Sequence, residues 1–337
     1  MTSCSDERTP EPVSAGLPRR TLAISVGIGV PLSIVLLALT VRHLDAAALE
    51  TALRSANPAY ILAAAGAMAL VYAAQALRWR VILHGAPASW KSFEWVVGAV
   101  AVNNVVPGRL GDVLRIEWVA RGAALPRARA AASVVVDRGF DVLTLVTALA
   151  LTYPFMHRAS WLDRVVLSGA ALGLLVVAVF AAVHAYARRG GRTSTGRVGR
   201  LVVEASRAAG EMVHGRRAVA AFLLSVAAWL TWACAAWLVA RSLGIGLSPL
   251  EIAFATAVIN LGVAIPSSPG FIGTYQWLGV STLGLFGVGD VHAFAFSVLL
   301  HAVWYIPTTL AGMALGARKL PPLVVAAARR TVENHAA

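Results

Sequence analysis

Long stretches of this chain carry no charged side chain, and this feature most constrains how the chain can fold. Uncharged apolar runs of spanning length occur at 21–41, 59–77, 165–187, 218–240 and 291–317. A helix needs about 20 apolar residues to cross the hydrocarbon core of a bilayer. Only 13% of the residues are charged, against about 25% in ordinary soluble domains. The pattern excludes a disordered chain, a fibrous repeat and almost any soluble globular enzyme, and it predicts an all-α polytopic membrane protein.

Three further regions are apolar but interrupted. The run 130–153 contains Asp137, Arg138 and Asp141. The regions 92–106 and 250–286 are each broken by polar residues rich in Pro and Gly. Both are poor candidates for simple membrane-spanning helices.

The positions of Lys and Arg predict which side of the membrane each loop faces, because cytoplasmic loops are enriched in these residues. Basic residues gather before residue 21, at 78–91, at 188–217 and after residue 317. These segments, and with them both termini, are predicted to be cytoplasmic in the cell membrane. Cytoplasmic loops then account for most of the formal net charge of +13, so no nucleic-acid partner is expected.

The same rule decides how the two interrupted regions are interpreted. If 92–106 crossed the membrane, the next segment would carry its arginines outside: Arg109, Arg115, Arg121, Arg127 and Arg129. A re-entrant hairpin that returns to the cytoplasm avoids this. By the same logic, 250–286 is predicted to be re-entrant from the outside. The sequence thus predicts about six full transmembrane helices and two re-entrant hairpins.

The ends of the chain are predicted to lie outside the membrane domain. Residues 1–20 are rich in Pro, Ser and charge, which predicts a disordered cytoplasmic tail. We interpret 21–41 as an uncleaved first span; a cleaved signal peptide is the alternative. The transmembrane domain is predicted over 21–320 and a second cytoplasmic tail over 321–337. No metal or cofactor is expected.

A short internal repeat organises the chain. Residues 107–112 (PGRLGD) align with residues 269–274 (PGFIGT) at an offset of 162. The same offset carries the run 59–77 into 218–240 and the run 130–153 onto 291–317. Each half, about 21–160 and about 161–320, then holds three crossings, so the second copy must be inverted. Inverted repeats with broken helices near the midplane are typical of alternating-access transporters.

The repeated motif suits the binding of an anion. Glycines permit tight turns at a helix break, and helix N-termini exposed there favour a phosphate. The glycines concerned are Gly108, Gly111, Gly270 and Gly273. Arg109 and Arg115 could grip a phosphate diester. Alternatively, these arginines only contact lipid headgroups at the inner surface.

Charged residues open the run 130–153. Asp137 and Asp141 share a helix face, and Arg138 can pair with Asp141. Charges at membrane depth are costly and usually face a partner or a cavity. We expect the cluster to pair with Arg109 or Arg115 and to have a functional or gating role. Alternatively, Asp137 and Arg138 lie at the interface and only Asp141 is buried.

The second half carries neutral polar residues instead: Ser267, Ser268, Thr274, Tyr275, Gln276 and His301. Hydroxyls and amides can bind headgroup oxygens without the desolvation cost of a charge. His301 could couple transport to protons, but we favour a hydrogen bond between packed helices. Three tryptophans, Trp229, Trp232 and Trp237, lie within an apolar run and are interpreted as packing residues.

Three segments together resemble a known family. They are residues 103–115 (NNVVPGRLGDVLR, with Asn103, Asn104 and Asp112), 133–141 (SVVVDRGFD) and 266–276 (PSSPGFIGTYQ). They resemble the membrane domain of lysylphosphatidylglycerol synthases, over about residues 21–320. The resemblance implies a flippase-like domain that moves a lipid headgroup between leaflets. This sequence departs from the family at four places. Asp112 and Asp137 stand where many members carry glutamate, which is a conservative change. Gln276 and His301 stand where many members carry glutamate and arginine, so the charged pair of the second half is absent.

We therefore expect a lipid flippase whose substrate is a phospholipid, an aminoacylated phospholipid or a lipid-linked sugar. Fused family members carry a soluble synthase domain, which is not expected here, so a separate synthase or glycosyltransferase would supply the lipid. A secondary transporter of a small solute is the alternative. An integral membrane enzyme is less favoured, because the Ser-Gly-His phosphatase, HExxH and Walker A motifs are missing.

Overall fold

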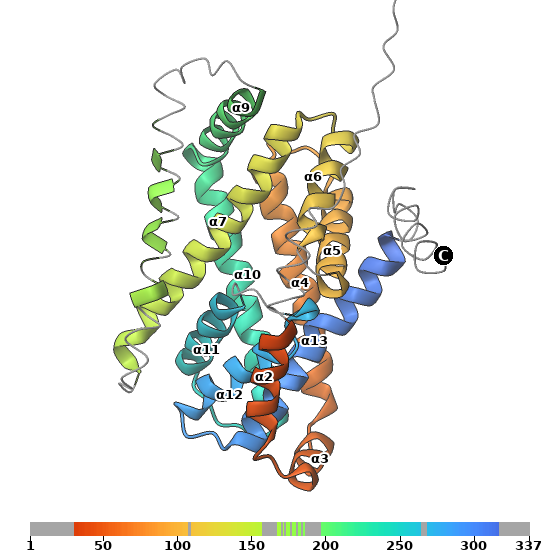
Figure 1. Ribbon diagram of the computed structural model, residues 1–337, viewed down its shortest axis with the longest axis vertical. Helices are drawn as coiled ribbons and strands as arrows, with labels where there is room; N and C mark the ends of the chain where they lie inside the picture. The colour runs from red at the N-terminus through yellow and green to blue at the C-terminus, as the bar shows by residue number, and fades with distance from the viewer. Residues whose placement is uncertain are drawn as a thin grey trace, which may run out of the picture.

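The computed structural model of the chain shows a helical protein (Figure 1). It describes residues 30–106, 109–156, 197–263 and 268–316, together with single positions and short stretches between 167 and 185. No strand occurs in these residues. The predicted tails and most of the predicted span 165–187 lie outside the described residues.

Three helices are long and apolar enough to cross a membrane: α4 (Pro58–Ile82), α10 (Gly215–Ser242) and α13 (Asp290–Gly316). Two shorter helices, α2 (Val30–Val41) and α3 (Ala46–Arg54), meet at an angle of 91° and would together make a fourth span. The all-α, polytopic character predicted from the sequence is therefore supported. The count of six full spans stays a prediction.

Helix α7 (Arg127–Thr152) matches the long helices in length but not in composition. It contains the buried residues Asp137 and Asp141 and, between them, the half-buried Arg138. A charge inside a membrane helix normally faces a partner or a cavity. Its neighbours must therefore supply compensating groups.

The two interrupted regions each form a helix, a break and a second helix. The first consists of α5 (Ser89–Val105) and α6 (Leu110–Gly122). The second consists of α11 (Pro249–Gly262), the short 3-10 helix η3 (Pro269–Phe271) and α12 (Thr274–Gly284). Figure 1 shows the first pair in the upper half of the molecule and the second pair in the lower half. That each pair returns to one membrane face stays a prediction.

The tips of the two pairs meet near the middle of the molecule. The Tyr305 hydroxyl of α13 donates a hydrogen bond to the Asn104 carbonyl near the end of α5, at 3.2 Å. Gly270 in η3 lies so close to this carbonyl that an added Cβ would be 3.2 Å from it. Both breaks therefore face the same central region.

Local sequence explains where several helices begin. The Asn57 side chain accepts a hydrogen bond from the Ala59 N–H, and Pro58 takes the first helical position of α4. Before α11, Ser248 and Glu251 cap each other's backbone N–H groups. These caps satisfy donors that a helix N-terminus otherwise leaves open.

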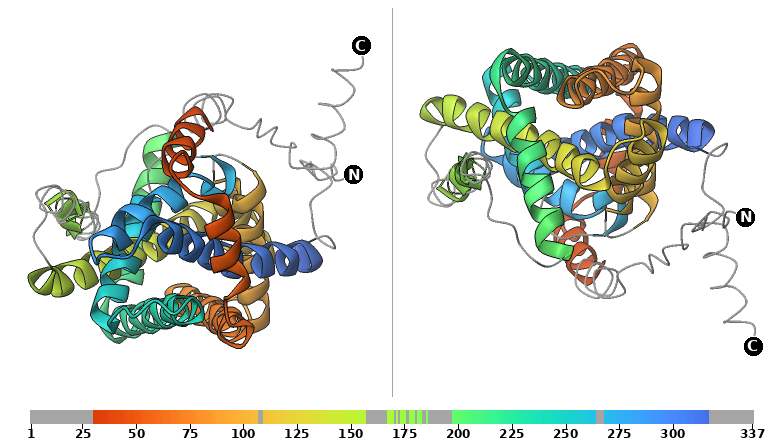
Figure 2. Two further views of the ribbon diagram at one scale, coloured as in Figure 1. Left: turned by 90° about the horizontal axis from the view of Figure 1, so that it is seen from below. Right: turned by 90° about the horizontal axis from the view of Figure 1, so that it is seen from above.

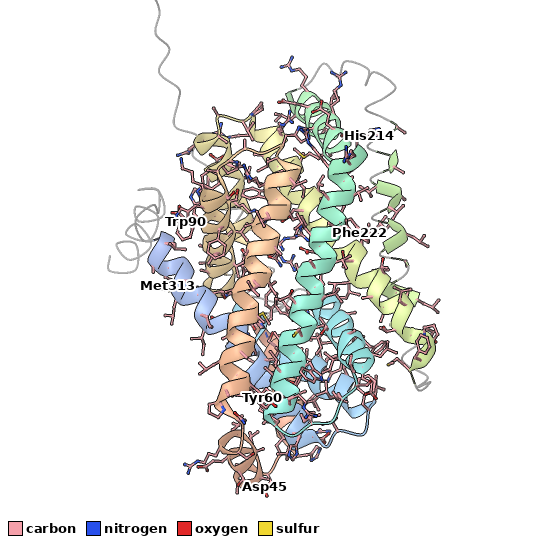
Figure 3. All side chains as sticks on the ribbon, turned by 180° about the vertical axis from the view of Figure 1, so that it is seen from behind. Asp45, Tyr60, Trp90, His214, Phe222 and Met313 are labelled. Atoms are coloured by element: carbon pink, nitrogen blue, oxygen red, sulfur yellow. The ribbon has the colours of Figure 1, made fainter. Side chains whose placement is uncertain are left out.

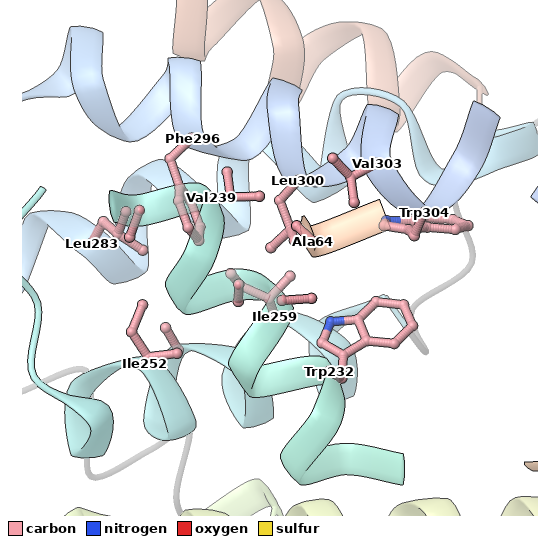
Figure 4. Close-up of a cluster of buried hydrophobic side chains, with 14 of the residues drawn as sticks. Ala64, Trp232, Val239, Ile252, Ile259, Leu283, Phe296, Leu300, Val303 and Trp304 are labelled. Atoms are coloured by element: carbon pink, nitrogen blue, oxygen red, sulfur yellow. The ribbon is translucent and has the colours of Figure 1, made fainter. Parts of the chain in front are cut away.

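Two large apolar cores, with a smaller one between α7 and α11, hold the helices together. One lies among α4, α10, α11, α12 and α13, and Figure 4 shows part of it, including Trp232, Ile259 and Leu300. The other joins the C-terminal part of α4 to α5, α6, α7 and α9 (Arg197–Met212), with Trp79 at its centre. Helix α9 packs against α7 at the end of the molecule seen from above in Figure 2.

Candidate functional site

A buried arginine joins α4 to α7 and α10. The Arg78 Nε donates to Asp137 Oδ1 at 2.8 Å, and its Nη1 donates to Asp141 Oδ1 at 2.6 Å. The same Nη1 also donates to the Ser225 hydroxyl of α10 at 2.8 Å. The residue is 0% exposed. Two carboxylates one turn apart on α7 offset a charge that would otherwise be very costly to bury.

The sequence interpretation of Arg78 was wrong. It placed this residue in the cytoplasmic loop after 59–77, whereas α4 continues to Ile82. The helix can continue because Asp137 and Asp141, far away in sequence, neutralise the guanidinium. The positive-inside rule alone cannot recognise such a partner.

Asp137 binds a second arginine. Its Oδ2 lies 2.9 Å from Arg115 Nη2, so the predicted ion pair between this cluster and Arg115 is present. The Arg115 guanidinium also lies 3.7 Å from the centroid of the Trp79 ring, in a cation–π arrangement. Arg115 is 2% exposed, so it does not face lipid headgroups at the surface.

Arg138 links α7 to α6 at the edge of the cluster. Its Nη2 donates to Asp112 Oδ1 at 2.9 Å, and its Nη1 donates to Asp141 Oδ2 at 3.4 Å. The second contact is the pair that the sequence spacing predicts. The Arg138 side chain keeps 38% of its surface exposed, which distinguishes it from Arg78 and Arg115.

The exposed part of the cluster faces a central cavity of about 230 Å³. Part of the cavity lining carries charges and amides. The lining residues there are Gln75, Asn103, Asn104, Arg109, Asp112, Arg138, Asp141 and Asn260. The charged and amide groups come mainly from the first half of the chain.

Another part of the cavity lining is aromatic. It is lined by Trp229, Trp232, Phe271, Tyr275 and Trp304, from the second half of the chain, with Tyr72 of α4. Trp229 joins the aromatic residues to the charged ones, since its indole N–H donates to Asp141 Oδ1 at 3.1 Å. Sequence reasoning treated Trp229 and Trp232 only as packing residues, because an apolar run does not distinguish a core face from a cavity face.

Arg109 differs from the other arginines of the site. It lies at the start of α6 with φ 55°, a left-handed conformation that is uncommon for a residue with a Cβ. It forms no ion pair with any residue that the structure describes. Its charge is therefore available at the cavity.

The second break is held by neutral hydrogen bonds. The Gly273 N–H donates to Gln276 Oε1 at 2.7 Å, so the Gln276 amide nitrogen must be the donor to His301 Nδ1, 2.9 Å away. The His301 ring also stacks on Trp304 with centroids 5.0 Å apart. The favoured interpretation of His301 as a packing hydrogen bond agrees with these contacts.

Helix α2 packs against the same break. The Ser33 hydroxyl accepts from the Ser268 N–H at 2.9 Å and lies 3.3 Å from the Thr274 hydroxyl. An added Cβ on Gly273 would be 2.2 Å from the Ser33 carbonyl oxygen. The break therefore depends on close approach of the backbone.

The sequence-predicted site residues fall into three groups. Seven line the cavity: Asn103, Asn104, Arg109, Asp112, Arg138, Asp141 and Tyr275. The others that can be placed support it from behind or shape the breaks: Gly111, Arg115, Asp137, Ser268, Gly270, Gly273, Thr274, Gln276 and His301. Gly108 and Ser267 lie outside the described residues. Within the described ranges, no group of three His, Cys, Asp or Glu residues could hold a metal ion.

Comparison with known proteins agrees with the resemblance carried by the motifs. Residues 22–312 match the family described as Lysylphosphatidylglycerol synthase TM region. The chain belongs to this family. It is also similar to Glycosyltransferase AglD of Haloferax volcanii, with 27% identity over 343 residues. That match covers 88% of this chain and 54% of the relative, so the chain spans about half the length of that protein.

Proposed function

We propose that this membrane protein translocates a lipid by moving its headgroup between leaflets. The candidate lipids are a phospholipid, an aminoacylated phospholipid and a lipid-linked sugar. One observation carries the proposal: a cavity at the tips of two broken helix pairs is lined by cations and amides as well as by aromatic rings. Backbone breaks at membrane depth are tolerated where they are buried in protein or line a cavity.

The charge of the site suits a phosphate diester. Four arginines (Arg78, Arg109, Arg115 and Arg138) face three aspartates (Asp112, Asp137 and Asp141), which leaves one net positive charge. The unpaired cation is Arg109, at the cavity wall. A guanidinium can bind two phosphate oxygens at once, and Arg138 is exposed enough to join it.

The size of the site suits a headgroup rather than a whole lipid. A volume of about 230 Å³ is below the roughly 300–1,000 Å³ of pockets that enclose drug-sized ligands. Acyl or polyprenyl chains would therefore stay in the bilayer while the polar group passes through the protein.

The helix boundaries support the inverted repeat that alternating access requires. Shifted by 162 residues, α7 would span 289–314, close to α13 (Asp290–Gly316), and α4 would span 220–244, close to α10. The contacts between these helices are also related by this offset. Helix α5 packs on α13 and α11 packs on α7, while the equivalent helices α4 and α10 pack on each other.

The backbone at the two breaks supports the same relation. Arg109 and Phe271 are equivalent at this offset, and both adopt the left-handed conformation, with φ 55° and 61°. Both also line the cavity. The second copy thus replaces a cation by an aromatic ring at the matching place.

Two other functions follow from particular observations. A small soluble solute could use the same cavity, which would make the protein a secondary transporter. The name of the Haloferax volcanii relative points to glycosyl transfer, but this chain covers 54% of that protein. We propose that the shared part moves a lipid and that a separate synthase or glycosyltransferase supplies it.

Reconstitution into liposomes tests the proposal. Fluorescent phosphatidylglycerol, lysyl-phosphatidylglycerol and polyprenyl-phosphate analogues are placed in one leaflet, and their appearance in the other leaflet is followed. We expect at least one analogue to cross faster than in empty liposomes, and Arg109→Ala to slow it about tenfold or more, as loss of a charged hydrogen bond would.

The matched control is Arg121→Ala, which removes an exposed arginine of the same helix that pairs with Glu117. It should leave the rate unchanged. If no lipid analogue crosses, the flippase proposal fails. Uptake of a soluble solute would instead favour the transporter, and a glycosylated product formed by the purified chain would favour the enzyme.

A further inference from the structure

A second recess lies between the C-terminal end of α4 and the N-terminal part of α10. It has a volume of about 820 Å³. Its walls are apolar and include Leu77, Val81, Val219 and Leu223, and its rim carries Arg80, Arg216 and Arg217. Figure 3 shows α4 and α10 side by side at the front of the molecule, with no other described helix lying over them.

The rim is strongly positive. None of its three arginines forms an ion pair with a residue in the described part of the chain, and Arg80 Nε donates only to the Gly85 carbonyl at 3.3 Å. Glu211, the carboxylate that interacts electrostatically with His84, already lies 3.4 Å from Arg129. The N-terminus of α10 adds the positive end of its helix dipole.

His84 lies in the positive electrostatic field of these arginines. Its Nδ1 lies 3.3 Å from Arg129 Nη2, and its Nε2 is buried without a described hydrogen-bond partner. Burial lowers the pKa of His84, and the charges of Arg217 and Arg129 lower it further. An anion beside this ring could accept a hydrogen bond from Nε2 and would offset the positive charge of Arg217.

We propose that this recess, the α4–α10 groove, binds an anionic phospholipid. The three arginines hold the phosphate, and an acyl chain lies along the apolar walls. A soluble anion would not need those walls, whereas a lipid of the surrounding bilayer presents both kinds of surface at once. Basic residues beside a membrane attract anionic headgroups, which fits the cytoplasmic leaflet predicted for this end.

The groove is separate from the central cavity. The hydrogen bond from Arg78 Nη1 to the Ser225 hydroxyl joins α4 to α10 directly behind it, at 2.8 Å. Both residues are fully buried. A lipid held in the groove therefore does not occupy the proposed translocation site, and the two sites can be tested independently.

Binding is measured on the purified full chain in a zwitterionic detergent, with phosphatidylglycerol and phosphatidylcholine titrated separately and retention read by native mass spectrometry. Phosphatidylglycerol should bind more tightly. The triple variant R80Q/R216Q/R217Q should weaken it by about fivefold for each arginine, on the order of 100-fold in total. The triple variant R42Q/R54Q/R241Q removes the same charge elsewhere and should have no effect.

A second variant tests whether the walls matter. Ala220→Trp fills the groove but keeps every arginine, so it should weaken phosphatidylglycerol binding at least tenfold and leave glycerol phosphate unaffected. Equal binding of the two lipids by the unaltered chain would overturn the proposal, whatever the variants do. So would glycerol phosphate binding as tightly as phosphatidylglycerol, because that would show a site for the anion alone.

Discussion

Asp137 balances the charge of two buried arginines. Its two oxygens lie 2.8 Å from Arg78 Nε and 2.9 Å from Arg115 Nη2, and all three side chains are almost fully buried. Pairs of this kind add little net stability over apolar packing, but removing one partner leaves a charge without compensation. The loss should therefore be large and local.

Asp137→Asn is expected to lower the free energy of unfolding by about 3–5 kcal/mol, because it leaves two buried guanidinium groups short of a carboxylate. Unfolding in detergent, followed by circular dichroism, measures this. Glu50→Gln is the control, since its pair with Arg54 is exposed and should matter much less. Similar losses in both variants would mean that Asp137 is not the centre of the network.

Trp229 is a single residue that links the buried charges to the proposed translocation cavity. Trp229→Phe keeps an aromatic ring at the cavity but removes the N–H that reaches Asp141. We expect a modest loss of stability of about 0.5–1.5 kcal/mol, the net value of one hydrogen bond, and a severalfold slower lipid translocation in liposomes. Trp237→Phe, on the same helix but outside the cavity, should change neither rate nor stability appreciably. If Trp237→Phe slowed translocation more than Trp229→Phe did, Trp229 would not belong to the site.

Single residues also show what the sequence can and cannot predict. The spacing of Asp137 and Asp141 placed both on one helix face, because helix geometry is local. Arg78 was misplaced, because its partners are more than fifty residues away and a lone arginine after an apolar run is typical of a loop. The cavity faces of Trp229 and Trp232 depend on the packing of both halves, which no local pattern contains.

The helix breaks are the elements on which the site depends, and Gly111 shows why they need glycine. Its N–H donates to Asn103 Oδ1 at 2.7 Å, which pins the start of α6 to α5. An added Cβ would lie only 1.9 Å from the Ala99 carbonyl oxygen. Because a backbone carbonyl, unlike a side chain, cannot rotate out of the way, α5 and α6 would have to move apart.

Gly111→Ala should therefore destabilise the protein by about 1–3 kcal/mol or more, as overpacking does. Gly66→Ala is the matched control, because its Cβ would meet nothing within 4 Å on the surface of α4. That change should stabilise the protein by about 0.5–1 kcal/mol, since alanine favours the helix. Thermal unfolding of both variants gives the comparison, and equal stability would argue against the close contact of α5 with α6.

At this scale the sequence predicted the order of helix, break and helix, because Pro and Gly punctuate the chain at both places. It did not predict where α4 ends. The apolar run stops at Leu77, but the helix continues to Ile82 through Arg78 and Trp79, both fully buried. Tertiary partners extended the helix beyond its apolar pattern.

Across the whole molecule, the proposed repeat relates the two halves by exchange of equivalent helices, and Figure 1 shows the pair α5–α6 and the pair α11–α12 in opposite halves of the molecule. Such a relation gives a protein two similar ways to pack around one central site, and alternation between them would open that site to either face. The prediction from sequence rested on a six-residue match and on loop charge. The helix bounds extend the alignment of the two halves from six residues to whole helices, and this alignment can be used to test the topology.

Cysteine labelling tests whether the repeat is inverted across the membrane. Cys4 and Cys234 are first replaced by serine, and single cysteines are then placed at two pairs of positions related by the offset of 162. The pairs are Ala88 with Leu250, and Arg127 with Gly289, at the starts of equivalent helices. All four residues are exposed.

An impermeant maleimide applied to intact cells should label Leu250→Cys and Gly289→Cys at once, and Ala88→Cys and Arg127→Cys only after permeabilisation. The reason is that the positive-inside rule puts the starts of α5 and α7 in the cytoplasm, and an odd number of crossings in each half puts the equivalent starts of α11 and α13 outside. If both members of a pair react from the same side, the halves are parallel and the alternating-access scheme fails. Translocation measured in the same variants would show that labelling reports the functional fold.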